Sequence, residues 1–360
     1  MNKTDPTDPS PGHVGQAVAT QASEAQRAAA PALLRMISGI HISRCVYAVA
    51  ELGIADLLAQ GPLTSEELAQ ATGMHEPSLY RVLRLLAALE VFEERDSRSF
   101  SLTAVGERLC RDVPVSMRSW AVFVEAFGGV RPFGHILETV KTGKPGFDIT
   151  FGMGVFEFVS QNPEAAAIFE AAMSDRTTAF APSVAATYDF ADLRTVVDIG
   201  GGKGTLLVEI LRRHAHLHGV LFEIPAVAAH ADAVLGAVDI SDRCEVVAGD
   251  FFERVPDGAD CYVMANVLHD WDDARSIEII GNCRRAMASR GRALIVERLI
   301  PEGGSDPIPT LLSDIMMLVI TGGQERTNAE YGTLLEAAGL SLNKVQPVAF
   351  PYGMIEGLAA

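Results

Sequence analysis

The chain has 360 residues, of which 48% are hydrophobic and 21% charged, a composition typical of a globular protein with room for two domains and a sizeable core. Its formal net charge of −17 repels the phosphate backbone of nucleic acids and the surface of anionic membranes, so we expect neither as a partner. The five cysteines stand singly along the chain, which excludes a CxxC zinc site and a disulfide framework and favours a reducing compartment.

Residues 1–28 are rich in Pro, Asp, Thr and Ser, and we expect them to form a disordered tail. No basic segment followed by an apolar stretch is present there, so we expect no signal peptide. The longest apolar runs, such as IMMLVI at 315–320, are too short to span a bilayer. The sequence therefore predicts a cytoplasmic protein.

Residues 29–115 show the pattern of an all-α, winged-helix-like domain. Apolar residues recur at three- and four-residue spacing from Ala29 and stop at Gly61-Pro62. The next segment predicts two capped helices and a short strand pair, with landmarks at Thr64 or Ser65 (cap), Gly73 (turn), Glu76-Pro77-Ser78 (second helix), and Phe92 and Phe100 (strands). Helix, turn, helix and strand pair together are typical of a winged helix.

Winged helices often bind DNA, but the charge of this one argues for another role. Its second helix carries only Arg81 and Arg84 among mostly apolar residues, and the stretch from Leu63 to Arg111 holds eight acidic residues against six basic ones. A DNA-binding face should be clearly basic. We therefore favour a dimerisation domain, in which the apolar helices between Ala29 and Leu58 are buried in a homodimer.

Residues 116–187 continue the helical pattern with many aromatic side chains. Nine of the 16 phenylalanines, and also Trp120, fall between residues 120 and 180. Aromatic rings suit a flat apolar pocket, although most of these are expected to pack in an ordinary helical core. This segment is predicted to connect the two halves and to line a substrate pocket.

Residues 188–360 alternate strands and helices, which predicts an α/β domain with a mostly parallel, seven-stranded sheet covered on both faces. Apolar strands are expected at TVVDI, GVLFE, CEVVAG, DCYVMAN and RALIVE, and two late strands near 341–348 and at the C-terminus complete the sheet. Helices are expected at about 205–214, 226–237, 274–288 and 328–338. In such Rossmann-like sheets, ligands bind at the carboxyl ends of the strands.

The loop after the first of these strands contains four glycines in five positions: Gly200, Gly201, Gly202 and Gly204. Glycine removes the Cβ atoms that would hold a ligand away from the backbone, and it tolerates positive φ. A tight strand-to-helix turn would need only one or two glycines, so the pattern favours a cofactor loop. The spacing does not fit the GxGxxG of nicotinamide-binding proteins; it fits GxGxG preceded by an acid, Asp198.

The ends of the second and third strands also carry residues suited to a nucleoside. Glu223 ends the second strand, where a carboxylate can accept hydrogen bonds from both ribose hydroxyls. Asp250 and Phe251 follow the third, where they would bind an adenine by its amino group and its face.

Six segments in this order carry a resemblance: VVDIGGGKG, FEIP, GDFFERVPDGAD, VLHDWDD, VERLIPEGG and TGGQERT. With these six segments, the chain resembles the S-adenosylmethionine-dependent O-methyltransferases of the plant caffeate and flavonoid type. It resembles most the bacterial members that act on aromatic antibiotics, such as the mitomycin and anthracycline methyltransferases. The resemblance covers nearly the whole chain and implies a class I methyltransferase fold, a homodimer, and S-adenosylmethionine without a metal.

His269 lies at the end of the fourth strand, and the motif alone does not separate a base from an ordinary strand-end histidine. Next to a cofactor loop, however, a histidine is placed where a base is needed, since a neutral phenol with a pKa near 10 is a poor nucleophile. The resemblance implies the same role for His269. It also implies that Glu297 and Glu325 orient its ring, whereas the residues alone leave two other interpretations open: Glu297 capping the sheet edge, and Glu325 paired with Arg326 on the surface.

The resemblance implies further contacts on both sides of the reaction centre. Trp271 would lie against the cofactor and Asp270 would be structural. Ala265 and Asn266 replace a cationic residue that several relatives use near the cofactor, and we keep Asn266 among the cofactor contacts. Phe169 and Met173 would contact the acceptor, and Ser174 the cofactor.

Three functions stay open from the sequence. The first is methyl transfer to a hydroxyl of an aromatic small molecule of secondary metabolism, such as an antibiotic precursor, with in-line attack on the methyl group. The second is N-methylation, or a hydroxylation or decarboxylation on the same fold. The third, a ligand-sensing regulator that binds DNA, is disfavoured by the acidic balance of the chain.

Overall fold

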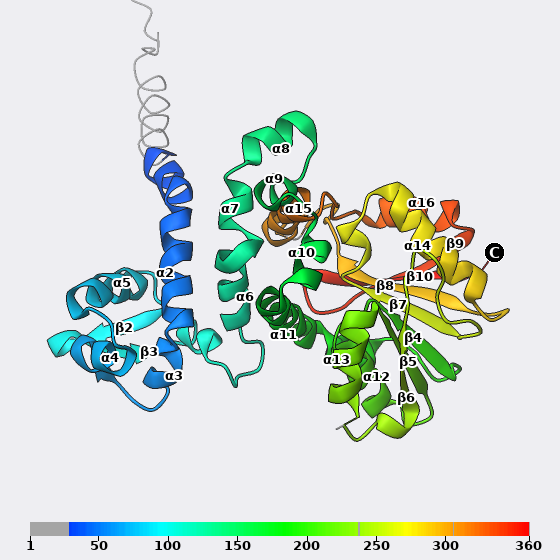
Figure 1. Cartoon of the computed structure of the whole chain (residues 1–360), viewed down its shortest axis with the longest axis horizontal. Coiled ribbons are helices and arrows are strands. Elements are labelled where there is room, and N and C mark those ends of the chain that lie inside the picture. Colours follow the sequence, from blue (N-terminus) through cyan, green and yellow to red (C-terminus); the bar gives the residue numbers. More distant parts are fainter. Residues whose placement is uncertain (1–28, 237, 305, 360) are drawn as a thin grey trace, which may run out of the picture.

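The computed structural model describes residues 29–236, 238–304 and 306–359. The predicted disordered tail, residues 1–28, lies outside this range. Figure 1 shows two lobes, a small helical N-terminal one and a larger one built on a twisted sheet, joined by helices between them. In the described residues no single helix is long and apolar enough to cross a membrane, although a bent pair, Ala29–Ile37 and Gly39–Glu51 at 45°, meets that test together.

The N-terminal lobe contains the predicted helices and also a small sheet. After the helical stretch Ala29–Ile37 come α2 (Gly39–Glu51), α3 (Ile54–Leu58), β1 (Leu63–Thr64), α4 (Ser65–Thr72), α5 (Glu76–Ala88), β2 (Phe92–Arg95) and β3 (Ser99–Leu102). The predicted pair β2–β3 is extended by β1, which pairs with β3, so the helical domain, predicted as all-α with one strand pair, carries a small three-stranded sheet.

Local sequence signals explain where α4 begins and ends. The Thr64 hydroxyl accepts a hydrogen bond from the Glu67 amide while the Glu67 carboxylate accepts one from the Thr64 amide, a reciprocal cap at the first turn. Gly73 ends the helix in the left-handed region, at φ +71°. The apolar faces of α2 to α5 and β3 then meet in one core that includes Ile54, Leu83 and Phe100.

Short helices connect the two lobes and lead to one long helix. They are α6 (Arg118–Phe123), a π-helical turn (Val124–Gly128), α7 (Val130–Phe133), α8 (Ile136–Thr142), α9 (Gly146–Phe151), α10 (Val155–Gln161) and α11 (Pro163–Thr187). Figure 1 shows α11 between α6 and the sheet of the larger lobe. Phe123, Phe127 and Phe147 are buried in the core of this region, and four further phenylalanines pack against it, so most of its phenylalanines belong to a helical core, as expected: Phe133, Phe151, Phe158 and Phe169.

The larger lobe is built on a seven-stranded sheet in the order β6-β5-β4-β7-β8-β10-β9. Its elements are β4 (Thr195–Ile199), α12 (Thr205–Arg213), β5 (His218–Glu223), α13 (Pro225–Leu235), β6 (Cys244–Ala248), β7 (Cys261–Ala265), α14 (Asp273–Ala286), β8 (Arg292–Arg298), α15 (Ile308–Ile320), α16 (Asn328–Ala337), β9 (Leu340–Pro347) and β10 (Tyr352–Ala359). The pairings among β4 to β8 are parallel, and β10 pairs antiparallel with β8 and β9. The predicted mostly parallel sheet is confirmed; α15 was not predicted.

Parallel order places five strand ends at one edge. Strands β4 and β7, at the centre, are apolar on both faces because helices cover both, and Val196, Val197 and Val263 are fully buried. Successive strands are added on one side of β4 up to β6 and on its other side from β7 onward. In an open α/β sheet, ligands bind at such a point, where the strand order reverses. The fold thus brings together the loops that follow β4, β5, β6 and β7.

Candidate active site

One cavity of about 470 Å³ opens at these strand ends. The sequence-predicted residues that line it come from the sheet and from α11: Phe169, Met173, Ser174, Asp198, Gly200, Gly201, Gly202, Glu223, Asp250, Phe251, Asn266, His269 and Trp271. Two predicted residues, Glu297 and Glu325, lie one layer deeper, against His269. Residues that are up to 156 positions apart along the chain are therefore brought to one site.

The glycine loop is shaped by backbone conformations and contacts that other residues would not tolerate. Gly200, Gly202 and Gly204 have φ of +64°, +60° and +76°. A Cβ on Gly201 would stand 2.4 Å from the Oδ2 of Asp198 and 2.6 Å from the side chain of Leu221. The loop therefore presents bare backbone to the cavity and then leads into α12.

Two acidic residues flank this loop, and they differ in their hydrogen bonds. The carboxyl of Asp198 is fully buried and its two oxygens have no hydrogen-bond partner among the described residues; burial, with Glu223 nearby, raises its pKa to about 7. Glu223 accepts hydrogen bonds from the amides of Gly202 and Ile224, both at 2.9 Å, while burial raises its pKa. An orphaned carboxyl beside a glycine cradle fits a ligand with a cationic group.

The loops after β6 and β7 add aromatic rings and a strained residue. Trp271 packs edge-on against Phe251 and Phe252. Asn266 adopts φ +54°, unusual for a residue other than glycine, and its buried side-chain oxygen has no partner among the described residues. Such strain and an unsatisfied acceptor are typical of a ligand contact.

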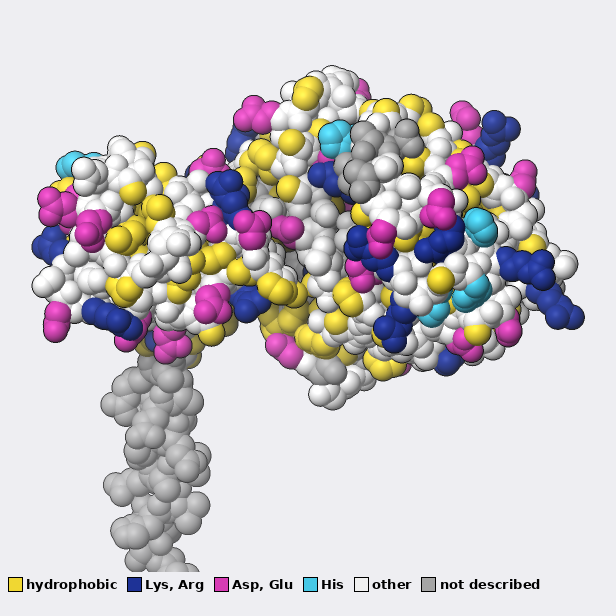
Figure 2. Space-filling model, turned by 90° about the horizontal axis from the view of Figure 1, so that it is seen from below, with side chains coloured by type: hydrophobic (Ala, Val, Ile, Leu, Met, Phe, Trp, Pro, Cys, Tyr) yellow, Lys and Arg dark blue, Asp and Glu magenta, His cyan; other side chains and the backbone are white. Residues whose placement is uncertain are grey.

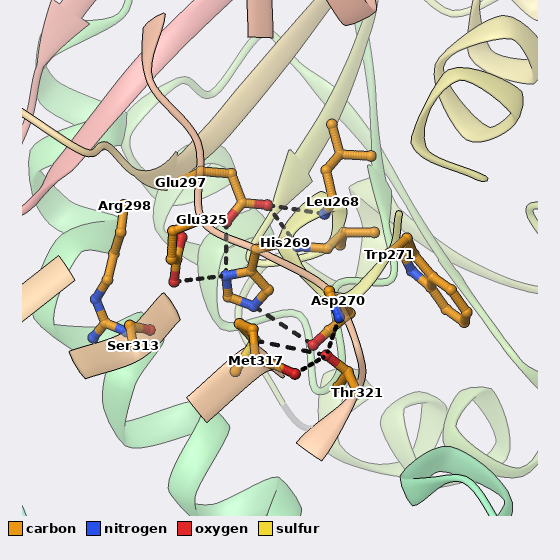
Figure 3. Close-up of polar contacts among 12 residues, drawn as sticks. Leu268, His269, Asp270, Trp271, Glu297, Arg298, Ser313, Met317, Thr321 and Glu325 are labelled. Carbon is orange, nitrogen blue, oxygen red and sulfur yellow. Dashed lines mark hydrogen bonds and ion pairs between the residues drawn. The ribbon is translucent and has the colours of Figure 1, made fainter. Parts of the chain in front are cut away.

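His269 is buried at the end of the cavity, between two glutamates (Figure 3). Its Nδ1 lies 3.1 Å from Oε2 of Glu297 and 3.3 Å from Oε1 of Glu325. Its Nε2 lies 3.8 Å from Oδ1 of Asp270. Because Nδ1 faces two carboxylates it carries a proton, and Nε2 is the nitrogen left to accept one.

The charges of this cluster depend on one another. Burial disfavours the imidazolium of His269, but the carboxylates of Glu297, Glu325 and Asp270 outweigh it and raise its pKa well above the ordinary value. Burial likewise opposes ionisation of Glu325, yet the charge of His269 beside it lowers the pKa of Glu325. Burial raises the pKa of Asp270 to about 6. A positive imidazole is therefore well stabilised here.

The turn that carries His269 is fixed from three sides. Oε1 of Glu297 accepts hydrogen bonds from the amides of Val267 and Leu268, each at 2.9 Å. Arg326 donates to the carbonyl oxygens of Leu268 (3.1 Å) and Trp271 (2.9 Å), and the amide of Gln324 donates to the carbonyl of His269 (2.9 Å). The imidazole is held by the backbone around it as well as by its own contacts.

These contacts decide the alternatives that the sequence left open. Glu297 does not cap a sheet edge, since β8 lies inside the sheet between β7 and β10. Glu325 is not a surface residue paired with Arg326: it is 3% exposed and faces His269, while the Arg326 guanidinium contacts Asp273 instead. Asp270, expected to be structural, lines the cavity.

The wall opposite the cofactor loop is aromatic and apolar. Phe169 and Met173 on α11 line it together with Phe123. Phe156 on α10 stacks on Trp271, with ring centroids 5.5 Å apart, so that α10 closes this side. Ser174, on the same helix as Met173, contacts the hydroxyl of Thr205 at 3.1 Å, close to the start of α12.

Several residues of the wall were not predicted, among them Phe123, Phe156, Met316, Ile320 and Arg176. Met316 and Ile320 belong to α15, whose apolar run had been weighed only as a membrane span. Arg176 lies on α11, where a lone cation in a mostly apolar helix gives no pattern. The sequence offered one weak signal for Arg176, its spacing of three after Met173, which places both on one face of a helix.

His269, Glu297 and Glu325 could also be considered as metal ligands, since one ligand atom of each lies within 4.8 Å of the others. The arrangement fits an acid–base cluster better. One oxygen of Glu297 is already engaged by two amides, and the other faces a nitrogen that bears a proton. A metal would need that nitrogen deprotonated.

Comparison with known proteins shows the family to which the chain belongs. The profile of the O-methyltransferase domain matches residues 133–341, and that of the O-methyltransferase dimerisation domain matches residues 34–112. A phenazine O-methyltransferase of Lysobacter antibioticus is 42% identical over 90% of this chain and 94% of its own. The chain belongs to the S-adenosylmethionine-dependent O-methyltransferase family.

Other members of this O-methyltransferase family show its range. The mitomycin biosynthesis 6-O-methyltransferase of Streptomyces lavendulae is 37% identical, over 92% of this chain and 95% of its own. A neocarzinostatin-biosynthesis O-methyltransferase, solved with S-adenosylmethionine and a hydroxynaphthoic acid, superposes with a TM-score of 0.77 at 34% identity, covering 88% of this chain and 96% of that one. An 8-amino-8-demethylriboflavin N,N-dimethyltransferase of Streptomyces davaonensis is 35% identical over 92% of this chain and 96% of its own.

The class I methyltransferase fold, the enzyme class and the cofactor S-adenosylmethionine follow from this membership. The glycine loop, the orphaned Asp198 and the aromatic group around Phe251 fit that cofactor.

Proposed function

We propose that this enzyme methylates a hydroxyl group of an aromatic secondary metabolite, with His269 as general base. The observation that carries the proposal is the buried His269 between two carboxylates, on the wall of a cavity lined by aromatic rings. S-adenosylmethionine, when bound, supplies an electrophilic methyl group. The chain must add alignment, which is worth roughly 7–11 kcal/mol of barrier, and removal of a proton, which is worth roughly 10²–10⁴-fold in rate.

Proton transfer in this proposal runs from the acceptor hydroxyl to Nε2 of His269. The imidazolium that forms is stabilised by Glu297 and Glu325, which also fix the tautomer through Nδ1. Phe169 and Met173 hold the aromatic ring flat against the cavity wall. Phe156, stacked on Trp271, covers one side of the cavity and would limit the access of water to the proton transfer.

The cofactor contacts are proposed from position in the cavity. Asp198, Gly200, Gly201 and Gly202 would hold the amino-acid part. Glu223 would bind the ribose hydroxyls. Asp250 and Phe251 would bind the adenine. Ser174, Asn266 and Trp271 would contact the cofactor as well.

We also propose the division of the chain into units of residues 29–115, 116–187 and 188–360, with a homodimer formed through the first. The absence of nucleic-acid and membrane partners remains a prediction, which rests on the charge of −17. A cytoplasmic location also remains a prediction, which rests on the singly placed cysteines and on the expected lack of a signal peptide and of a membrane span.

N-methylation is the second candidate, because one relative of similar identity is an N,N-dimethyltransferase. An amine that is neutral at working pH needs no base before it attacks, so His269 favours the hydroxyl.

A mass-spectrometric assay with S-adenosylmethionine and matched phenols and anilines tests the proposal. We expect the phenols to give products heavier by one CH₂ group, with the new methyl group on the oxygen. Methylation of the anilines alone would replace O-methylation by the second candidate, and no product from either panel would overturn both.

A further inference from the structure

Arg176 stands out in the acceptor side of the cavity because its charge has no partner. It lies on α11, three residues after Met173 and seven after Phe169, on the face that lines the cavity. Its Nε and Nη2 are buried and form no hydrogen bond within the described part of the chain. No carboxylate among the described residues comes within ion-pair distance of it either.

The position of the guanidinium is nevertheless fixed. Its central carbon lies 4.6 Å from the ring centroid of Trp120 on α6, so that the planar group rests on the indole face. Trp120 lines the same cavity. A planar fork held on a rigid ring presents its N–H groups in one direction and loses little entropy when they bind.

Among the described basic residues that line the cavity, Lys203 and His269 face carboxylates, whereas Arg176 forms no ion pair. Lys203, on the cofactor side, is paired with Glu170 at 3.3 Å. Arg298 lies near Arg176, and the repulsion between them, second to burial, lowers the pKa of Arg298. Asp270 is near enough to be affected by Arg176 but contacts His269 instead.

An unpaired guanidinium that is largely withdrawn from water is costly unless an anion compensates it. The cost is tolerated in the free protein and recovered when a ligand supplies the anion. A carboxylate matches the fork with two parallel hydrogen bonds, and the aromatic wall beside it matches a ring.

We propose that the acceptor is an aromatic acid: a ring that carries a carboxylate in addition to the hydroxyl to be methylated, with the carboxylate bound by Arg176. The inference rests on the proposed function for the identity of the reacting group, but the binding of the acid does not require methyl transfer. Arg176 thus determines specificity and fixes which way the ring enters the cavity.

Calorimetry on protein saturated with S-adenosylhomocysteine tests this, with hydroxybenzoates and hydroxynaphthoates each compared with the corresponding carboxamide. We expect the acids to bind about 100-fold more tightly than the amides, a ratio in the range seen when one partner of a buried charge pair is lost. Arg176→Gln should remove this preference by weakening the acids about 100-fold while leaving the amides within about threefold. Arg176→Lys, which keeps the charge without the fork, should retain part of it.

The matched control is Arg131→Gln. Arg131 also rests on an aromatic ring, at 4.8 Å from the centroid of Phe151, but it does not line the cavity, so this variant should bind acids as the wild type does. Equal binding of acids and amides by the wild type would overturn the proposal, as would an Arg176→Gln variant that weakens both alike. Methylation of neutral phenols as efficient as that of acids would do the same while leaving the proposed function intact. Arg176-dependent binding of acids without any methyl product would support this proposal and contradict the proposed function.

Discussion

At the scale of single residues, the state of His269 is set by the balance between burial and two carboxylates. Burial opposes the imidazolium, but Glu297 and Glu325 outweigh it and raise the pKa of His269. A base must be neutral to accept a proton. The raised pKa of His269 therefore moves the acidic limb of the pH–rate profile to a pH above the ordinary pKa of histidine. The rate of methyl transfer should therefore rise with pH through that limb.

We expect Glu325→Gln to move this limb to lower pH, because one of the charges that stabilise the imidazolium is removed. On the plateau the rate should fall by less than the roughly 10²–10⁴-fold that loss of a base costs, since the ring stays in place. The measurement is kcat/KM against pH. Glu302→Gln, which removes an exposed carboxylate, is the control and should leave the acidic limb at its wild-type pH. If the acidic limb of Glu325→Gln also stays at the wild-type pH, the carboxylate does not set the pKa of His269.

At the scale of elements, the turn between β7 and α14 holds the base through its backbone. Arg326 is 1% exposed and donates to two of the carbonyl oxygens of this turn, Leu268 and Trp271. Its contact with Asp273 adds less, because the Asp273 side chain is 63% exposed and solvent screens the pair. The structure of the turn depends more on the two carbonyl contacts than on the ion pair.

Arg326→Leu should therefore lower the free energy of unfolding by about 2–3 kcal/mol, since the buried carbonyl of Leu268 and the partly buried carbonyl of Trp271 lose a charged donor. It should lower kcat more than it raises KM for S-adenosylmethionine, because only Asn266 and Trp271 of the proposed cofactor contacts belong to this turn. Urea denaturation and steady-state kinetics measure the two effects. Arg290→Leu, which removes an exposed guanidinium beyond the end of α14, should do neither. Normal kcat in Arg326→Leu would show that the turn needs no such support.

At the scale of the whole molecule, an apolar surface is left uncovered on the N-terminal helices. Leu33, Leu34, Met36, Ile37 and Ile40 are all more than half exposed, and Met36 reaches 76%. On the face in Figure 2, by contrast, side chains of both charge signs are interspersed over both lobes. An apolar stripe of this kind in a chain with a dimerisation domain is best explained by a partner subunit.

We expect the protein to be a homodimer and Ile37→Glu to dissociate it, because a charge buried in an apolar interface is left unpaired. Sedimentation equilibrium at micromolar concentration measures this. Phe350→Glu, at an exposed phenylalanine between β9 and β10, should leave the dimer intact. A wild-type monomer, or an Ile37→Glu dimer as stable as the wild type, would contradict the interface.

Sequence patterns predicted the sheet of the large lobe because its strands are short apolar runs. They indicated a cofactor loop because a tight turn needs only one or two glycines, and this loop has four in five positions. The environment of His269 was harder, since Glu297 and Glu325 reach it from distant segments and have other possible partners in sequence. The small strand β1, only two residues long, and the helix α15 lacked a distinct periodic signal. Arg176 could not be singled out, because a residue without a partner shows its importance only when its surroundings are known.

The most direct test of the account is the rate of His269→Ala on phenols of graded acidity, measured with S-adenosylmethionine at saturation. If His269 is the base, the variant should fold, bind S-adenosylhomocysteine as the wild type does, and lose about 10²–10⁴-fold in kcat on weakly acidic phenols. The loss should shrink steadily as the phenol becomes more acidic, because an acceptor that is already ionised needs no base. A His269→Ala enzyme that methylates a weakly acidic phenol at the wild-type rate would remove the base from the account and leave alignment alone.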